Sequence, residues 1–363
     1  MKRLAIITTV LVAHLVVLAW FIRGCQYDNS IAPPDAGRTA GSGENGAIVD
    51  NQPGTGGSDS GSGSDVPDGG GSFANGGFSG SGHSKRPVNI YQPQQFEPAK
   101  ASLPNEMHSY VKSCRSGVLL DFTSNRLLWS KAPKEAVPVA SMTKMMTVLL
   151  LMESLESQGD LSLDTRVPVT RSAAAIGGRQ VYLDPREQLT IEELLKCTVI
   201  RSANDTAFLI AEYLSMGDVQ AFVRRMNRRA DELGFPSARF STPHGLPLRG
   251  AEVDKASPME LAYLAHLLLQ YPAVTKWSST RLDSIRGEGS QFPRFQLVNT
   301  NGLVGKVAGV NGMKTGYTDD AGYCMTATCI RNGRTLVAVV TGCRTGASRD
   351  EFVKQLFEWG YEQ

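Results

Sequence analysis

Between residues 139 and 155 apolar side chains recur every three or four positions, which predicts a helix with one buried face. The positions concerned are Met142, Met145, Met146, Leu149 and Leu150. A hydroxyl residue three before a glutamate predicts two further helix starts, because such pairs form capping boxes. These pairs are Thr190 with Glu193 and Ser257 with Glu260, the second followed by Pro258 at the first helical position.

Alternating or β-branched stretches predict strands near both ends of the folded part. Residues 117–122 and 126–130, separated by Thr123-Ser124-Asn125, predict a hairpin, and residues 323–330 and 335–341 predict a second strand pair. Asp218 is predicted to cap a helix that ends at Gly234, and residues 349–359 predict a final helix. Strands at both ends with helices between them indicate an α+β domain.

An uncharged apolar run occupies residues 4–22, after Met-Lys-Arg and before Arg23. The run is long enough for one bilayer crossing, and the preceding positive charges predict a cytoplasmic N-terminus. We therefore expect residues 1–23 to be an uncleaved anchor in the bacterial inner (cytoplasmic) membrane, with the rest of the chain on the periplasmic, extracytoplasmic side. The alternative is a lipoprotein site at Cys25. Gly24 fits that alternative, but Arg23 and the length of the run do not.

Residues 24–101 consist largely of Gly, Ser, Asp, Asn and Pro. Such a segment has too little apolar surface to offset its chain entropy, so we expect a disordered linker. At about 5 to 6 Å times the square root of its length, a flexible chain of roughly 75 residues averages about 45 to 50 Å end to end. The folded domain is predicted to cover residues 102–363.

Three short motifs carry possible chemistry. Ser141 and Lys144 lie three apart at the start of the first predicted helix, so the lysine amine can reach the serine hydroxyl. Ser202 and Asn204 follow, and then Lys314-Thr315-Gly316. Taken alone, the second motif would more often be a helix cap and the third a strand ending in a turn. In this order they match the SxxK, SDN and KTG pattern of penicillin-binding proteins and class A β-lactamases, with Ser-Ala-Asn in the middle.

Longer segments carry the same likeness. VASMTKMMT, IRSANDTAFLIAEYL, STPHGLP and GMKTGYTDDAGYCMTATC resemble the serine D-alanyl-D-alanine carboxypeptidases of peptidase family S11, which are low-molecular-weight penicillin-binding proteins. The resemblance extends from about Ser116 to Trp359. It implies a β-lactamase/transpeptidase-like fold, in which helices cover an antiparallel sheet and a helical subdomain is inserted.

The resemblance also implies an activity. Such an enzyme removes the terminal D-alanine of peptidoglycan stem peptides through a seryl acyl-enzyme during cell wall biogenesis, and β-lactam antibiotics inhibit it. No metal or organic cofactor is implied. An endopeptidase would use the same residues on cross-links. A class A β-lactamase would need a glutamate in an ExxLN context, and no such match lies between Ala203 and Met313. A catalytically silent wall-binding module is the remaining alternative.

Ser141 is the expected nucleophile. Lys144 is the candidate general base, because desolvation and a nearby cation such as Lys314 would lower its pKa. Ser202 is expected to relay a proton to the leaving amine, and Asn204 to position the lysine or the substrate amide. A Ser-His-Asp triad through His244 is disfavoured because the lysine already fills the role of the base.

Substrate binding is assigned to the third motif. Lys314 is expected to keep its proton and to hold the substrate carboxylate together with the Thr315 hydroxyl, while Gly316 lets a peptide approach the strand closely. The resemblance implies that the backbone N–H groups of Ser141 and Tyr317 form the oxyanion hole.

Composition narrows the classes of function and of site that remain possible. The net charge of +2 gives no reason to expect a nucleic-acid partner, and five separated histidines contain no zinc motif. The five cysteines after residue 101 are an odd number, so we expect mostly buried thiols and predict no particular bridge. Arg179 stands where family members often have a small polar residue, and Arg201 adds a cation before the second motif. Either arginine could alter substrate preference.

Overall fold

The structure is a computed structural model that describes residues 92, 95–247, 250 and 252–363. The predicted anchor at 1–23, the lipidation alternative at Cys25 and the predicted linker up to residue 91 lie outside the described residues. Within the described ranges, no helix is both long and apolar enough to cross a membrane.

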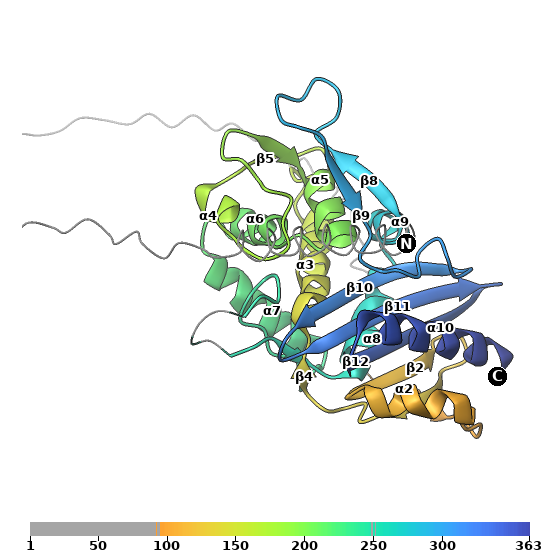
Figure 1. Cartoon of the computed structure of the whole chain (residues 1–363). Helices are drawn as coiled ribbons and strands as arrows, with labels where there is room; N and C mark the ends of the chain where they lie inside the picture. The colour runs from red at the N-terminus through yellow and green to blue at the C-terminus, as the bar shows by residue number, and fades with distance from the viewer. Residues whose placement is uncertain (1–91, 93–94, 248–249, 251) are drawn as a thin grey trace, which may run out of the picture. The chain divides into compact units, whose positions relative to one another are not determined.

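A six-stranded sheet forms the base of the folded domain (Figure 1). The spatial order is β1-β3-β2-β12-β11-β10, and every neighbouring pair is antiparallel except β1 with β3. The strands are β1 (Glu97–Pro98), β2 (Ser116–Asp121), β3 (Arg126–Lys131), β10 (Val310–Thr318), β11 (Gly322–Arg331) and β12 (Arg334–Cys343). Both predicted strand pairs are confirmed, and the carboxyl-terminal half of the domain supplies the edge strand β10.

Helices cover both faces of this sheet (Figure 1). α10 (Gly346–Glu362) packs on β11 and β12 from one side and contacts α2 (His108–Ser113), which follows the short turn η2 (Asn105–Met107). α8 (Pro258–Leu268) packs on β2, β11 and β12 from the other side. The α+β prediction is therefore confirmed.

The sheet separates two hydrophobic cores. On β11, Cys324 belongs to the core that contains Met142 and Tyr263, whereas Cys329 packs with Phe352 and Leu356 of α10. Successive side chains of a strand point to opposite faces, so residues five apart lie on opposite sides, as the sequence spacing predicted.

The helical part of the domain lies between β3 and β10 in the sequence. It contains η3 (Ala140–Thr143), α3 (Lys144–Ser157), α4 (Arg171–Ala174), α5 (Ile191–Lys196), η4 (Cys197–Arg201), α6 (Asn204–Leu214), α7 (Val219–Glu232) and α9 (Pro272–Ser278). Three two-stranded pairs accompany them: β4 (Val137–Pro138) with β7 (Lys255–Ala256), β5 (Arg166–Pro168) with β6 (Gln188–Thr190), and β8 (Leu282–Ile285) with β9 (Phe295–Val298). α3 contacts both α6 and α8, so it connects the helical part to the covered sheet.

Local capping residues set several helix boundaries as predicted. Both capping boxes are present, at the start of α5 and of α8. The Asp218 carboxylate accepts a hydrogen bond from the N–H of Ala221 at the start of α7. At the other end Gly234 has a φ of 77°, and the N–H groups of Gly234 and Phe235 bond back to the last turn in a Schellman arrangement.

The ordered part begins before the predicted boundary at residue 102. Phe96 is buried and packs edge-on against Phe122 at 5.1 Å and Tyr263 at 5.9 Å between ring centroids. The N–H of Glu97 donates to the Asn125 carbonyl, which extends the sheet by β1. One aromatic side chain in a largely polar stretch supplies this attachment, so composition alone placed the boundary too late.

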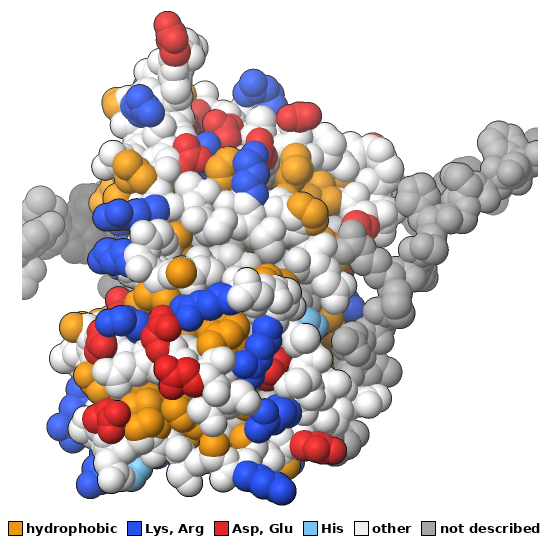
Figure 2. All heavy atoms as spheres, turned by 90° about the vertical axis from the view of Figure 1, so that its right-hand side faces the viewer, with side chains coloured by type: hydrophobic (Ala, Val, Ile, Leu, Met, Phe, Trp, Pro, Cys, Tyr) orange, Lys and Arg blue, Asp and Glu red, His pale blue; other side chains and the backbone are white. Residues whose placement is uncertain are grey.

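Charged side chains are spread over the surface visible in Figure 2, and the cysteines of the described residues lie in the interior. On the face viewed in Figure 2, basic and acidic side chains are interspersed with small hydrophobic areas. All five cysteines of the described residues are buried free thiols, as expected. Burial raises the pKa of each of these thiols, that of Cys324 to about 11 and that of Cys343 to about 12.

Candidate active site

Ser141 lies in the tight turn η3, directly before α3. Met142 of this turn and Met145 of α3 are buried in the core, so the apolar face predicted from the sequence anchors the turn. Ser141 itself is only partly buried, whereas Lys144 at the start of α3 is fully buried. The fold therefore presents the serine to the cleft and places the lysine beneath it.

The Lys144 amine contacts three oxygen atoms. Its Nζ lies 2.9 Å from Ser141 Oγ, 2.7 Å from Asn204 Oδ1 and 2.6 Å from the His244 carbonyl oxygen. An ammonium group has three hydrogens and would donate to all three oxygens. A neutral amine has two hydrogens and one lone pair, so it can donate to the amide and the carbonyl while it accepts the hydroxyl proton of Ser141.

Burial lowers the pKa of Lys144 to about 7. The charged form loses its hydration in the interior, and this effect outweighs the buried carboxylates of Asp254 and Asp205, which raise the pKa. The cation that lowers it further is Arg179, whereas the sequence had suggested Lys314. A large fraction of neutral amine is thus present near neutral pH.

The second motif follows an unusual turn. The π-helical turn η4 ends at Ser202, which has a φ of 64°, and Asn204 is the first residue of α6. Ala203 is the N-cap and makes no side-chain cap bond, so Ser202 and Asn204 do not cap this helix. Instead the Asn204 amide joins Lys144 to the Gly177 carbonyl, to which Nδ2 donates at 2.9 Å.

The third motif occupies the middle of β10 rather than a strand end. Lys314 is buried, and its Nζ donates to Ser202 Oγ at 2.7 Å and to the Thr315 carbonyl at 2.9 Å. Lys314 and Ser202 come from segments 112 residues apart. This bond joins the edge strand of the sheet to the helical part across the cleft.

The surroundings of Lys314 disfavour the charged state that we expected for its amine. Burial lowers the pKa of Lys314 well below its ordinary value, and the charges of Lys144, Arg179 and Arg349 act in the same direction. We expected this amine to keep its proton. Without an anion beside it, burial and the neighbouring cations both disfavour the charged form of this amine.

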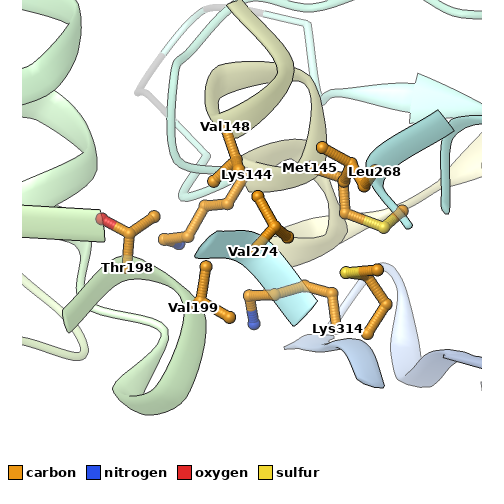
Figure 3. A pocket seen from close by; sticks show the side chains of 9 residues that line it. Lys144, Met145, Val148, Thr198, Val199, Leu268, Val274 and Lys314 are labelled. Carbon is orange, nitrogen blue, oxygen red and sulfur yellow. The ribbon is translucent and has the colours of Figure 1, made fainter. Parts of the chain in front are cut away.

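A small cavity lies between the two lysine side chains (Figure 3). Lys144 enters it from α3 and Lys314 from β10, as the close-up shows. The other lining residues are Met145, Val148, Thr198, Val199, Leu268, Val274 and Met313. The lining is mostly apolar, in agreement with the burial of both lysine side chains.

Gly316 permits close contact between β10 and η3, the turn that carries the expected nucleophile Ser141 (the nucleophile turn). A Cβ atom at Gly316 would lie 2.7 Å from the Val139 carbonyl and 3.3 Å from the Ser141 nitrogen. The next residue, Tyr317, is half exposed on the same edge strand. The backbone nitrogen of Ser141 therefore lies against the strand that carries Tyr317.

The turn around His244 contributes to the site through its backbone. The His244 carbonyl accepts from Lys144, while its ring Nδ1 accepts from the N–H of Leu246. Burial lowers the pKa of the His244 ring to about 3. The sequence drew attention to the imidazole, but the lysine is bonded by the carbonyl, a role that residue type does not reveal.

Gly245 and Asp254 were not predicted as site residues. A Cβ at Gly245 would lie 2.0 Å from the Ala140 carbonyl oxygen, and its φ is 80°. The Asp254 carboxylate accepts from the hydroxyls of Thr143 at 3.0 Å and Thr242 at 2.7 Å. These contacts fix the nucleophile turn against the loop at residues 241–245. A glycine after Pro243-His244 was the only signal available in the sequence.

The geometry suits acyl transfer through a serine. A hydroxyl next to a buried amine supplies a nucleophile and a base, and a second amine with a second hydroxyl lies opposite. The described part of the chain contains no group of three or more metal-ligating side chains.

Comparisons with known proteins agree with this chemistry. Residues 104–345 match the family model described as D-alanyl-D-alanine carboxypeptidase, peptidase S11. The chain is 37% identical to D-alanyl-D-alanine carboxypeptidase DacF of Bacillus subtilis over 75% of its own length and 68% of that protein. It is 31% identical to DacA of Haemophilus influenzae over 67% of its length and 61% of that protein. The matched segments thus span about two thirds of these relatives.

Solved structures show the same fold. Penicillin-binding protein 6B from Escherichia coli superposes with a TM-score of 0.64 at 27% identity, covering 74% of this chain and 81% of that one. Penicillin-binding protein D2 from Listeria monocytogenes, in its ampicillin-bound form, superposes with a TM-score of 0.60 at 25% identity, covering 69% of this chain and 98% of that one. The expected β-lactamase/transpeptidase-like fold is confirmed.

Proposed function

Because the chain belongs to the D-alanyl-D-alanine carboxypeptidase family of serine peptidases, we propose that it removes the terminal D-alanine from peptidoglycan stem peptides, with Ser141 as the nucleophile. The observation that carries this proposal is the buried Lys144 amine, whose pKa of about 7 and 2.9 Å distance from Ser141 Oγ suit a general base.

The acylation step begins at Ser141. Neutral Lys144 takes the hydroxyl proton while Oγ attacks the carbonyl carbon of the penultimate D-alanine. The backbone N–H groups of Ser141 and Tyr317 would stabilise the oxyanion, which the closeness of Gly316 to the Ser141 nitrogen supports. The tetrahedral intermediate then collapses and releases the amine of the terminal D-alanine.

The leaving amine needs one proton. Ser202, bonded to Lys314, can donate its hydroxyl proton to that amine and take one from the lysine behind it. Lys144 then passes the proton that it took from Ser141 through the Ser202 hydroxyl to Lys314, so both lysines regain their starting forms before deacylation. In deacylation a water molecule gives a proton to neutral Lys144 and attacks the ester, and the proton returns to Ser141 Oγ. Over one cycle the amide bond and one water molecule are consumed, and the enzyme regains its starting protonation.

The substrate carboxylate is assigned to β10. Lys314 and the Thr315 hydroxyl would hold it, and the anion would raise the pKa of Lys314 towards its charged form. This pairing accounts for a buried amine that has no carboxylate partner among the described residues. Gly316 leaves room for the peptide backbone along the edge strand.

Two further aspects belong to the same proposal. Benzylpenicillin would acylate Ser141, by analogy with the ampicillin-bound relative from Listeria. A membrane location rests on the apolar sequence at residues 4–22 with its preceding positive charges. Fractionation of cells that express the full chain, with and without residues 1–23, tests the second aspect, since only the full chain should sediment with the membranes.

Mass spectrometry of the intact protein tests the acyl-enzyme. A soluble version of residues 92–363 is incubated with benzylpenicillin beside Ser141→Ala, with Ser157→Ala as the control because it removes an exposed hydroxyl from the end of α3, the helix that follows Ser141. A lasting one-to-one adduct on the native protein and the control, absent from Ser141→Ala, supports the proposal. Rapid turnover of the drug without an adduct would favour a β-lactamase, and absence of both would favour a silent binding module.

Substrate preference is tested in parallel. Release of D-alanine from a monomeric pentapeptide, faster than cleavage of cross-linked muropeptides, is the expected result for a carboxypeptidase. The reverse order would favour the endopeptidase alternative, an activity named for a Pseudomonas aeruginosa relative that is 30% identical.

A further inference from the structure

Two arginines flank the second motif, Ser202 and Asn204, through their backbone. The carbonyl of Arg179 accepts a hydrogen bond of 2.7 Å from the N–H of Asn204, and Arg201 directly precedes Ser202. Both side chains therefore extend from backbone that holds the second motif. Their guanidinium groups are not part of the proposed acyl-transfer chemistry.

Neither arginine forms an ion pair with a carboxylate in the described ranges. Arg179 is exposed, and the Nε atom of Arg201 is buried without a hydrogen-bond acceptor. Arg286 offers a contrast, because its guanidinium is paired with Glu187 at 2.6 Å. Cations that lack a carboxylate partner among the described residues are suited to an anionic ligand.

An apolar surface lies beside these two charges. The Arg201 guanidinium stacks over the Phe295 ring at 5.9 Å, and Tyr182 packs edge-on against the same ring at 6.0 Å. Tyr182 is 66% exposed, which is unusual for so large a side chain. Such a surface can receive the methylene groups of a side chain whose end carries a charge.

Four cationic groups act on one another here, while the Asp205 and Asp254 carboxylates oppose them at Lys144. Burial is the largest cause that lowers the pKa of Arg179, Lys144 and Lys314; the charge of Arg201 lowers that of Arg179 further, and the charge of Arg179 lowers those of both lysines further. These groups are therefore close enough to repel one another. A bound anion would relieve the repulsion, and the C-terminal carboxylate of the substrate is already assigned to Lys314 and Thr315.

We propose that Arg179 and Arg201 form an anion subsite that selects peptide substrates carrying a second carboxylate on the residue that precedes the two D-alanines. The D-alanines themselves have only methyl side chains, so a second carboxylate near the scissile bond must come from the preceding residue. This inference rests on the proposed carboxypeptidase function and names the substrate class of that site.

Three matched peptides test the subsite. Each is an Nα-acetylated X-D-Ala-D-Ala in which the X side chain ends in a carboxylate (L-α-aminoadipate), in the corresponding carboxamide, or in an ammonium group (L-lysine). The readout is the ratio of kcat/KM for the carboxylate peptide to that for the carboxamide peptide. We expect the native protein to prefer the carboxylate about tenfold or more and the ammonium peptide least.

Substitutions identify the residues responsible. Arg179→Gln and Arg201→Gln should each lower the ratio, and the double variant should bring it close to one, whereas Arg179→Lys should retain part of the preference. The matched control is Arg224→Gln, which removes an exposed charge from α7 and should leave the ratio unchanged. Loss of Arg179 also raises the pKa of Lys144, but that effect is common to all peptides and cancels in the ratio.

The outcomes distinguish failure of the anion subsite from failure of the proposed carboxypeptidase function. If the native protein cleaves all three peptides equally, or if the double variant keeps the preference, the subsite is refuted and the carboxypeptidase stands. If the native protein cleaves none of them, the proposed function fails. Acylation by benzylpenicillin, measured on every variant, identifies folded protein, so a variant that fails to fold is recognised and the remaining single variants decide the question.

Discussion

At the scale of single residues, the site depends on one nitrogen atom with two charge states. Burial depresses the pKa of Lys144 from its ordinary value to about 7. A base acts in its neutral form, and the neutral fraction of an amine grows as the pH rises through its pKa. The rate of acylation by benzylpenicillin should therefore increase between about pH 6 and pH 8 and reach a plateau above.

Asn204→Asp should move this profile to higher pH. The substitution places a carboxylate where the amide oxygen now lies, 2.7 Å from Lys144 Nζ, and a neighbouring negative charge favours the protonated amine. Acylation should fall at least tenfold at pH 7 and recover in part at higher pH. Rate constants measured from pH 5 to pH 10 would detect the shift.

The control for that experiment is Asn332→Asp, which makes the same chemical change in an exposed turn between β11 and β12. Its profile should coincide with that of the native protein. A profile for Asn204→Asp that is lowered at every pH without a shift would indicate that the asparagine positions the substrate rather than setting the charge of the lysine.

At the scale of elements, the nucleophile turn depends on a contact between two loops. Gly245→Ala would place a Cβ atom 2.0 Å from the Ala140 carbonyl oxygen and 2.9 Å from the Ser141 nitrogen. The turn must then shift, so we expect acylation to fall by more than a hundredfold and the melting temperature to drop by several degrees. Penicillin acylation and thermal unfolding of the same sample are the two measurements.

Gly217→Ala is the control that separates the effect of a steric clash from the effect of backbone strain. Gly217 also has a positive φ, of 95°, but a Cβ there would meet no atom within 4 Å. The control should lose a little stability and keep its acylation rate. Equal effects of the two substitutions would mean that strain alone is responsible and that the close approach at Gly245 is unimportant.

The elements that could be predicted are those with local causes. Neighbours in the sequence specify the capping boxes at Thr190 and Ser257. They also specify the hairpin of β2 and β3, whose turn contains Asn125. The positive φ of Ser202 and the carbonyl contact of His244 depend on segments that meet only in the folded chain. For the site, the spacing of three residues predicted that Lys144 approaches Ser141. The order of the motifs indicated which other residues belong to the site, but it did not predict the hydrogen bonds between them.

At the scale of the whole molecule, the folded unit includes a segment with the composition of a linker. Phe96 fills a site between Phe122 and Tyr263, and β1 pairs with β3. A chain that begins at Ser102 should therefore unfold at a lower temperature than one that begins at Gln92, and Phe96→Ala in the longer chain should account for most of the difference, about 3 kcal/mol. Thermal and urea unfolding of the three proteins would measure it.

A substitution outside the contact provides the comparison. Glu97→Ala removes an exposed side chain from the same short strand and should leave stability almost unchanged. Equal stability of the long and short chains would mean that the segment before residue 102 packs too weakly to matter.

The sheet that divides the molecule also divides its thiols. Cys197 and Cys324 belong to the core on the side of α3, and Cys114, Cys329 and Cys343 to the core beneath α10. Each buried thiol becomes reactive only when its own surroundings open. The natural sequence thus contains separate chemical reporters for the two cores. The order in which these thiols become labelled during unfolding would reveal whether the core beside α3 unfolds before the core beneath α10.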